Sequence, residues 1–558
     1  MALESVLRGK LNAVASRPRT FALVAALCAV CWFVFGPPGG DSAAHLYQTQ
    51  AWREHGWRFW DNFWYAGRYS QVNYSLLYYP LAAVFSHVVV IGASLGGSAW
   101  AFARIVGRQW PRLAIWPSLA FALLAPLAVP AGTYPFMLGL ALALSVIVAL
   151  QSRHLGLAIG CALLAALAHP LALVFLIAIL VAVGAVTRDW MSDWRMLVFA
   201  GGLALVTAGQ VLMLRAFASD GAQYPFDPKD AAAITGFCLA GLALAWGRRE
   251  LRILRAIFVA YGALAALAFL ITSPIGGNVV RLLLVMGTPL LLIPIAARRF
   301  RPRSAVVAIV AATMCWQALP ALAGLRTTQT ARAQHESFWY PAIAFLDQHS
   351  DPNNRVEVVA TADNWEAYYL ARRGVPLARG WFRQDDWPSN APLYGTLTPV
   401  KYQRWLRTMG IRYVLLPNDP LDESAKAEAR LLESGTSGLR ESARMGAWRI
   451  FELPRATPIA TPRAEIEVLS LRSDGVTLRA RTPGTFRLSL RYTPYWHVTR
   501  GRACVGPAAP WGTELRVGRP GIVRIRFDVR ARTVVSAVLG DQGGCAPSGT
   551  GSAGRSAI

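Results

Sequence analysis

The sequence predicts a polytopic α-helical membrane protein with a C-terminal domain of mixed α/β and β-sandwich structure outside the membrane. Three observations predict this fold class. Of the 558 residues, 54% are hydrophobic and only 16% are charged, and the mean hydropathy of +0.35 is too high for an ordinary soluble enzyme. Apolar runs of the length that crosses a bilayer recur between residues 21 and 325. Residues 326–558 return to ordinary polarity.

The apolar runs predict about eleven transmembrane helices. The first, Phe21 to Gly36, follows several basic residues and lacks the small-x-small cleavage site of a secretory signal, so we interpret it as a retained span. Ten more runs follow, most of them close to the ~20 residues that a helix needs to cross a bilayer. They cover residues 76–99, 113–131, 134–150, 155–168, 171–186, 196–218, 231–246, 253–271, 279–297 and 305–325.

The charges between these runs predict the topology. A net charge of +25 is typical of nucleic-acid-binding proteins, but many arginines here lie in short loops, where the positive-inside rule places them. We therefore expect membrane lipids, and no nucleic acid, as partners. With a cytoplasmic N-terminus every inner loop is basic, and an odd number of spans places the chain after Leu325 outside the bacterial cytoplasmic membrane. The inner-loop arginines are Arg104, Arg108, Arg112, Arg153, Arg188, Arg195, Arg248, Arg249, Arg252, Arg255, Arg298, Arg299, Arg301 and Arg303.

The chain after the last span predicts two exported subdomains. We expect a membrane core over 1–325, an α/β subdomain over 326–440, a β-sandwich subdomain over 441–540 and a disordered Gly- and Ser-rich tail over 541–558. Helical or alternating patterns predict helices at 338–349, 399–409 and 421–432, and strands at 355–360, 412–416, 448–453, 466–471, 476–481, 485–492, 513–517 and 521–529.

The seven cysteines agree with this division. Five lie in apolar spans, where a thiol behaves as a small hydrophobe. The other two, Cys504 and Cys545, fall in the predicted exported domain, so we expect a disulfide between them in an oxidising compartment.

The segment from Gly39 to Pro80 is the most informative stretch for function. It reads GGDSAAHLYQTQAWREHGWRFWDNFWYAGRYSQVNYSLLYYP and joins two apolar runs. It holds Asp41, His45 and many Trp and Tyr residues, which prefer the water–lipid interface. A substrate at that boundary would meet a carboxylate here, so Asp41 is the candidate catalytic base.

Several stretches carry a family resemblance. They are GGDSAAH, WDNFWYAGRYSQVNYSLLYYPLA, YPFMLGLALAL, the His-Pro pair at a span mouth, and SPIGGNVVR. In this order they resemble bacterial integral-membrane glycosyltransferases of the C superfamily (GT-C), within it the actinobacterial type similar to 6-pyruvoyl-tetrahydropterin synthase-related membrane proteins. The exported part, with IRYVLLP and LRYTPYWHVTRGRACVG, resembles the tails of that group and of the YfhO-like proteins.

The resemblance implies transfer of a sugar from a polyprenyl-phosphate sugar donor to a cell-wall glycan, glycolipid or glycoprotein on the extracytoplasmic side. Asp41 matches the acidic residue that such enzymes place in the first outer loop. Many of them have two adjacent acids there, whereas Gly40-Asp41-Ser42 has one. No required cofactor can be inferred, and a divalent metal lacks support because too few ligands lie near His45.

The chemistry can also be argued from the residues. Attack by a sugar hydroxyl on an anomeric carbon needs a base, and a carboxylate within hydrogen-bond reach serves. A leaving lipid phosphate needs a cation at the same depth. Arg281 is the first candidate for that cation and Arg68 the second. The predicted substrate-binding set is His45, Asp61, Arg68, Tyr69, Asn73, His169, Asn278 and Arg281.

Alternatives stay open for these residues and for the function. Asp41 could cap a helix over 42–55, the aromatic residues could form an interfacial belt, and Asp61 and Glu54 could be solvated loop charges. A lipid or polysaccharide transporter and a non-catalytic scaffold are the alternative functions. Transport is disfavoured because no internal repeat is visible and the spans are nearly free of charge. Nucleotide-sugar chemistry is disfavoured because neither a Rossmann fingerprint nor a P-loop is present.

Overall fold

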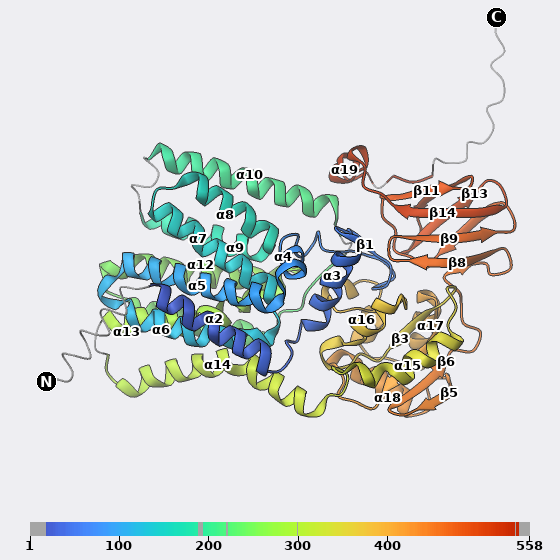
Figure 1. Cartoon of the computed structure of the whole chain (residues 1–558), viewed down its shortest axis with the longest axis horizontal. Helices are drawn as coiled ribbons and strands as arrows, with labels where there is room; N and C mark the ends of the chain where they lie inside the picture. The colour runs from blue at the N-terminus through green and yellow to red at the C-terminus, as the bar shows by residue number, and fades with distance from the viewer. Residues whose placement is uncertain (1–17, 188–192, 219–220, 298–299, 542, 546–558) are drawn as a thin grey trace, which may run out of the picture. The chain divides into compact units, whose positions relative to one another are not determined.

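The computed structural model describes residues 18–187, 193–218, 221–297, 300–541 and 543–545 (Figure 1). The chain forms two compact units. The first comprises the described residues up to Trp57, Gln71–Leu214 and the described residues from 221 to Gln334. The second comprises Arg58–Ser70, the described residues from Arg215 to 218, and the described residues from His335 onward. Most of the tail predicted as disordered, 541–558, lies outside the described residues.

The first unit is helical. In the described part of the chain, seven helices are long and apolar enough to cross a membrane, and three shorter apolar segments accompany them. A helix suits a bilayer because it satisfies every backbone hydrogen bond internally. The seven are α2 (Pro18–Phe35), α5 (His87–Gln109), α7 (Tyr134–Gln151), α10 (Trp194–Ala216), α12 (Arg252–Leu270), α13 (Val280–Ala297) and α14 (Arg303–Thr330). The shorter segments are α6 (Ile115–Leu124) with the 3-10 helix η2 (Ala125–Ala131), α8 (Leu155–Ala168) and α9 (Pro170–Val186).

Each predicted apolar run contains a helix, with two notable differences. The run predicted at 76–99 is interrupted at Ser86, whose φ is +74°, so that α4 (Tyr78–Phe85) ends there and α5 continues to Gln109. The run predicted at 231–246 forms α11 (Pro228–Ala245), which is not among the seven. Membrane character and a helical core are therefore supported, while the count of eleven spans stays a prediction.

A buried amide stabilises the interior of α13. Pro289 lies inside this helix, where a proline disturbs the hydrogen bonds of the preceding turn. The N–H of Thr288 and the C=O of Leu284 would pair with each other in a regular α-helix. Here the N–H of Thr288 donates to Oε1 of Gln317 at 3.0 Å, and Nε2 of Gln317 donates to the oxygen of Leu284 at 2.8 Å. Gln317, on α14, is fully buried.

Gln317→Leu is expected to lower the thermal stability of the helical unit. The substitution leaves a buried donor and a buried acceptor without their side-chain partner, at about 1–3 kcal/mol each. Thermal unfolding of the full chain in detergent measures the loss. Leu319→Met, on the exposed face of the same helix, is the matched control and should leave the melting temperature unchanged. Equal melting temperatures for Gln317→Leu and wild type would contradict this role.

The second unit contains a four-stranded sheet in the order β3-β4-β6-β5. Strands β3 (Arg355–Val358) and β4 (Ile411–Pro417) are parallel, whereas β5 (Arg440–Met445) and β6 (Trp448–Glu452) continue the sheet antiparallel. Between β3 and β4, helix α17 (Pro399–Met409) begins after the capping Thr398 and ends at Gly410 in the left-handed conformation. Helices α15 (Glu336–His349), α16 (Glu366–Tyr369) and α18 (Lys426–Glu433) belong to the same region.

Two further four-stranded antiparallel sheets follow. Their orders are β12-β13-β10-β7 and β11-β14-β9-β8. Burial alternates along β13 (Thr513–Val517), as expected of a strand with one face in a core. The other strands are β7 (Ala460–Thr461), β8 (Ile466–Arg472), β9 (Gly475–Ala480), β10 (Gly484–Leu488), β11 (Trp496–Arg500), β12 (Ala503–Pro507) and β14 (Gly521–Phe527), followed by helix α19 (Ala531–Val538). Cys504 on β12 forms a disulfide with Cys545, with a Cα–Cα distance of 5.6 Å.

A hairpin from the first predicted outer loop belongs to the second unit. Its strands are β1 (Trp60–Asp61) and β2 (Arg68–Tyr69). The ring of Trp60 stacks on Phe527 with centroids 5.6 Å apart, and the N–H of Asn62 donates to the oxygen of Ser473 at 2.9 Å. The chain therefore leaves the helical unit after Trp57 and returns to it at Gln71.

Candidate active site

Asp41 lies in the helical unit where the chain enters α3 (Ser42–His55). It occupies the N-cap position, yet its side chain makes no capping hydrogen bond. The alternative in which this carboxylate serves only to cap the helix is therefore not supported by its geometry. The side chain is 15% exposed, and its Oδ2 lies 3.9 Å from Nη2 of Arg281.

Two close backbone approaches position Asp41. Gly132 ends η2 with a φ of +76°, and a Cβ there would lie 2.4 Å from the backbone nitrogen of Asp41. A Cβ on Gly39 would lie 2.8 Å from the Cα of Gly132. A residue without Cβ is needed at both positions, because only glycine permits backbones to come this close. The predicted outer connections at 39–41 and at 132 thus meet at one end of the helical unit.

His45, on α3, also contacts Gly132. Its Nε2 lies 2.7 Å from the oxygen of Gly132, so Nε2–H donates to that carbonyl. Burial lowers the pKa of His45 to about 3, with the neighbouring His87 acting in the same direction, so the ring is neutral at physiological pH. His45 is 1% exposed and supports the position of Asp41, and its contact with substrate stays a prediction.

Arg281 lies in the first turn of α13, with a side chain that is 12% exposed. Its Nη1 is 3.2 Å from Nε2 of His169, the residue between α8 and α9. The N–H of Leu171 faces the other ring nitrogen, Nδ1, at 3.2 Å. A neutral imidazole has only one acceptor nitrogen and cannot accept from both donors. When Nδ1 accepts from Leu171, Nε2 carries the proton, and this N–H of Arg281 is available to an anionic ligand.

Tyr74 lies beside this pair, in the loop that returns from the hairpin. Its ring packs edge-on against His169 with centroids 5.1 Å apart. Burial raises the pKa of the Tyr74 hydroxyl to about 12, while the Arg281 guanidinium acts in the opposite direction. The hydroxyl is therefore protonated at neutral pH, so it can donate to a phosphate oxygen and can either donate to or accept from a sugar hydroxyl. The sequence motif contained Tyr74, but only the contact with His169 singles it out from the other aromatic residues.

The remaining predicted residues divide between the two units. Asn73 and Asn278 are half-buried residues of the helical unit, and Asn278 lies in the 3-10 helix η5 (Gly276–Val279) just before Arg281. Asp61 is buried in the hairpin of the second unit, where its Oδ1 accepts from the N–H of Phe63 at 2.9 Å. Their roles in substrate binding stay predictions.

Arg68 and Tyr69 also belong to the hairpin. Nε of Arg68 donates to Oδ2 of Asp385 at 2.6 Å, and both side chains are less than 5% exposed. The guanidinium also lies 3.9 Å from the centroid of the Phe382 ring. The hydroxyl of Tyr69 is 2.8 Å from that of Thr493. Since Arg68 is held in a buried ion pair, Arg281 is the better candidate for the cation that binds a phosphate.

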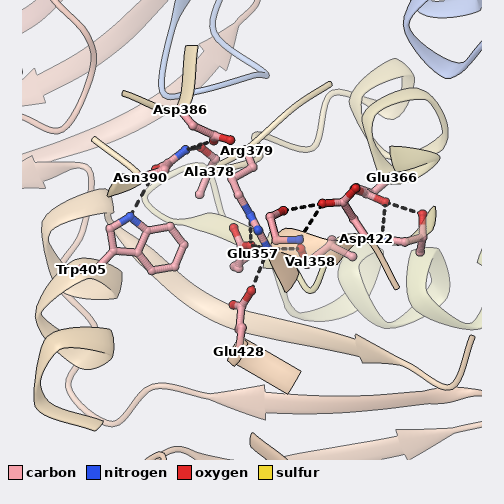
Figure 2. Close-up of polar contacts among 12 residues, drawn as sticks. Glu357, Val358, Glu366, Ala378, Arg379, Asp386, Asn390, Trp405, Asp422 and Glu428 are labelled. Carbon is pink, nitrogen blue, oxygen red and sulfur yellow. Dashed lines mark hydrogen bonds and ion pairs between the residues drawn. The ribbon is translucent and has the colours of Figure 1, made fainter. Parts of the chain in front are cut away.

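A second group of buried charges surrounds Arg379 in the second unit (Figure 2). Nε of Arg379 donates to Glu357 at 2.6 Å, and Nη2 donates to Glu428 at 2.7 Å. Burial raises the pKa of Glu357 well above its usual value, against the opposing effect of Arg379 and with a further increase from the Glu428 carboxylate. The hydroxyl of Tyr402 donates to the other oxygen of Glu428 at 2.6 Å. These contacts join β3, α17 and α18, so the cluster is structural.

Glu366 is expected to make the second unit less stable as pH rises. Burial raises its pKa to about 7, although Thr361 opposes this by donating to the carboxylate. The folded state then holds a proton that the unfolded state releases near pH 4.5. The contribution to stability is complete below pH 4.5 and is lost towards pH 7, with a maximum of about 3 kcal/mol.

Hydrogen exchange of the β3 amides in the full chain at pH 5 and pH 8, corrected for intrinsic rates, measures this change. Glu366→Gln should reduce the pH dependence, because an amide cannot ionise. Asp363→Asn is the control. Burial raises the pKa of Asp363 to about 6, so this substitution should reduce only the part of the stability loss that is complete near pH 6. An unchanged pH dependence in Glu366→Gln would refute the assignment.

Within residues 18–187, 193–218, 221–297, 300–541 and 543–545, no three His, Cys, Asp or Glu side chains group closely enough to hold a metal ion. The site itself contains the Asp41 carboxylate, the Arg281 guanidinium, the Tyr74 phenol and the His169 imidazole.

Comparisons with known proteins identify a similar fold. No protein-family model matches the chain, and no curated protein matches its sequence. A cryo-EM structure of the arabinofuranosyltransferase AftD from mycobacteria, in a mutant form, is 17% identical, with a TM-score of 0.51, over 84% of this chain and 43% of AftD. Another AftD structure is 16% identical, with a TM-score of 0.49, over 84% of this chain and 41% of that chain. The chain thus spans about two fifths of the length of these structures, and it shares its fold with that part of AftD.

Proposed function

We propose that this chain is a membrane glycosyltransferase that moves a sugar from a polyprenyl-phosphate sugar to a cell-envelope acceptor on the extracytoplasmic side. The observation that carries the proposal is the pairing of a half-buried carboxylate with a half-buried guanidinium, Asp41 and Arg281, 3.9 Å apart at one end of an apolar helical unit. The fold that the chain shares with AftD supports the same reaction class.

The two charges take complementary roles in this reaction. The acceptor hydroxyl attacks the anomeric carbon, and Asp41 takes the hydroxyl proton as the new C–O bond forms. The bond between the anomeric carbon and the phosphate oxygen breaks, and the lipid phosphate leaves as an anion. Arg281 stabilises the charge that develops on this leaving group. His169 lies 3.2 Å from the guanidinium and Tyr74 packs edge-on against His169, so these two rings border Arg281.

A transfer assay with several donor classes tests the proposal. The full chain in nanodiscs is supplied with radiolabelled polyprenyl-phosphate sugars and, separately, with nucleotide sugars, together with a cell-envelope extract as acceptor. Polyprenyl-phosphate arabinofuranose is the first donor to test, because the AftD name specifies arabinofuranosyl transfer. We expect transfer from a polyprenyl-phosphate donor only. Transfer from nucleotide sugars, or no binding or consumption of any lipid-linked donor, would favour another function, such as the scaffold or transport alternatives.

Arg281→Gln is expected to raise the donor KM about 10- to 100-fold, because a hydrogen bond to a charged group contributes about 1.5–3 kcal/mol. Arg281→Lys keeps the positive charge but lacks the planar guanidinium, so its donor KM should lie between those of wild type and Arg281→Gln. Steady-state kinetics with varied donor concentration measures the change. Arg53→Gln is the control, since its guanidinium is also in the helical unit but exposed on α3. Equal donor KM values for Arg281→Gln and wild type would remove Arg281 from phosphate binding.

A further inference from the structure

The helical unit contains an apolar cavity that the proposed reaction does not use. Helices α5, α7, α9, α12 and α13 contribute its walls, and its volume is about 430 Å³. This volume is in the range of sites that hold small molecules, roughly 300–1,000 Å³. The walls are formed by residues such as Val106, Leu144, Ile147, Ile179, Leu254 and Met286. Such a surface suits a hydrocarbon ligand.

The cavity is elongated along the helices. Leu282 and Ile293 on α13 both line it, and they lie about 16 Å apart along the helix axis at 1.5 Å per residue. A smaller apolar cavity shares Leu144, Ile147 and Met286 with it and continues to Phe136. A long, narrow and apolar space of this kind matches one extended acyl chain better than a compact ligand.

One end of the cavity is lined by polar residues, among them two arginines. Gln151 is the last residue of α7 and Arg153 follows it, while Asp193 directly precedes α10 and Arg195 lies in its first turn. Asp193 already accepts the N–H of Arg195 through its Oδ1 at 3.0 Å, as a helix cap does. Two arginines therefore line this end with one aspartate, whose carboxylate caps α10, and the Arg195 guanidinium also lies 5.8 Å from the centroid of the Trp194 ring. The charge favours an anionic head group.

The cationic end is distant from Asp41 and Arg281. Arg281 and His169 lie at the N-terminal ends of α13 and α9, whereas the polar end of the cavity is reached by Thr187 and Ile293 at the opposite ends of the same helices. From Arg281 to Ile293 the helix rises about 18 Å, more than half of the ~30 Å hydrocarbon core of a bilayer. A phosphate at Arg153 and Arg195 and a phosphate at Arg281 therefore belong to different lipids.

We propose that this cavity binds one hydrocarbon chain of an anionic membrane phospholipid, with the lipid phosphate at Arg153 and Arg195. The lipid enters from the membrane face opposite to the candidate active site. It fills the space between α5, α7, α9 and α13 and thereby supports the packing of the helices that carry His169 and Arg281. Binding of this lipid does not depend on sugar transfer, so the two proposals can fail separately.

Photo-crosslinking tests the proposal in the full chain. The protein is reconstituted in nanodiscs with phosphatidylglycerol that carries a photoactivatable group on one acyl chain, and labelled peptides are mapped by mass spectrometry. We expect labels on the lining segments of α7, α9 and α13. Ile147→Trp fills the cavity and should reduce this labelling ~5-fold or more, because an acyl chain that is excluded from the cavity binds with lower affinity. Leu163→Trp, on the exposed face of α8, is the matched control and should leave them unchanged.

The head group is tested separately. Arg153→Gln combined with Arg195→Gln should reduce phosphatidylglycerol labelling to the level of a phosphatidylcholine probe, whereas Arg108→Gln combined with Arg112→Gln should not. Equal labelling by the two probes in wild type, or labels that Ile147→Trp does not reduce, would overturn the proposal in favour of ordinary surrounding lipid. Displacement by inorganic phosphate would indicate a phosphate site without a lipid chain. Displacement by decaprenyl phosphate, but not by unlabelled phosphatidylglycerol, would assign the cavity to a polyprenyl chain instead.

Discussion

Asp41→Asn is expected to lower kcat for sugar transfer by about 10²- to 10⁴-fold, the contribution typical of a positioned general base. Asparagine has nearly the same shape as aspartate but cannot take the proton of the attacking hydroxyl. Because the Asp41 carboxylate makes no capping bond to α3, the substitution should leave the helix in place. The donor KM should remain similar or fall, since Arg281 loses a neighbouring carboxylate that competes with phosphate. Single-turnover transfer and donor binding by the same preparation measure the two effects.

Glu54→Gln is the matched control for this experiment. Glu54 is an acid on the same helix, with a side chain that is 52% exposed. The Glu54→Gln variant should transfer sugar at the wild-type rate. If Asp41→Asn transfers as fast as wild type, Asp41 is not the base. If Glu54→Gln loses activity instead, the base lies further along α3.

Arg379→Met is expected to destabilise the second unit by about 3–5 kcal/mol, because it leaves buried carboxylates without their cation. Glu357 and Glu428 are both fully buried or nearly so, and each accepts a hydrogen bond from the Arg379 guanidinium. Hydrogen exchange of the β3 and β4 amides in the full chain reports the free energy of opening for this region.

Two further variants make this prediction specific to the buried pairings. Arg383→Met breaks the ion pair between Arg383 and Asp422, in which the arginine side chain is 34% exposed. This substitution should lower the free energy of unfolding by no more than about 1 kcal/mol. Combining Arg379→Met with Glu357→Gln and Glu428→Gln removes the unpaired charges and should restore much of the lost stability. A small effect of Arg379→Met, comparable to that of Arg383→Met, would mean that the carboxylates are already protonated without the arginine.

Sequence patterns with a local cause predicted much of the secondary structure. The helix predicted at 399–409 is α17 (Pro399–Met409), and the strand predicted at 513–517 is β13 (Thr513–Val517). Apolar runs and periodic patterns predict such elements well because the pattern and the element occupy the same residues. Short strands such as β7 (Ala460–Thr461) escaped prediction, because two residues carry no periodicity and their pairing depends on distant partners.

The candidate site shows the same division. The sequence singled out Asp41, His169 and Arg281 by their places at span ends, and the structure brings these residues together through Gly132 and the start of α13. The sequence ranked Arg281 before Arg68 as a phosphate ligand, but it could not reveal that Arg68 is held in a buried ion pair. Arg68 pairs with Asp385, which lies 317 residues later in the chain, and no local sequence pattern around Arg68 predicts that partner.

The sequence by itself determined that this is a membrane protein with a helical core and a mixed C-terminal region, because hydrophobicity and charge act on each segment separately. Only the tertiary structure decided which charged groups pair, that the hairpin of β1 and β2 belongs to the second unit, and that Gln317 bonds to the backbone around Pro289. These features depend on contacts between residues far apart in the chain. In a low-dielectric interior each buried polar group needs a partner, and the fold selects which one is within reach.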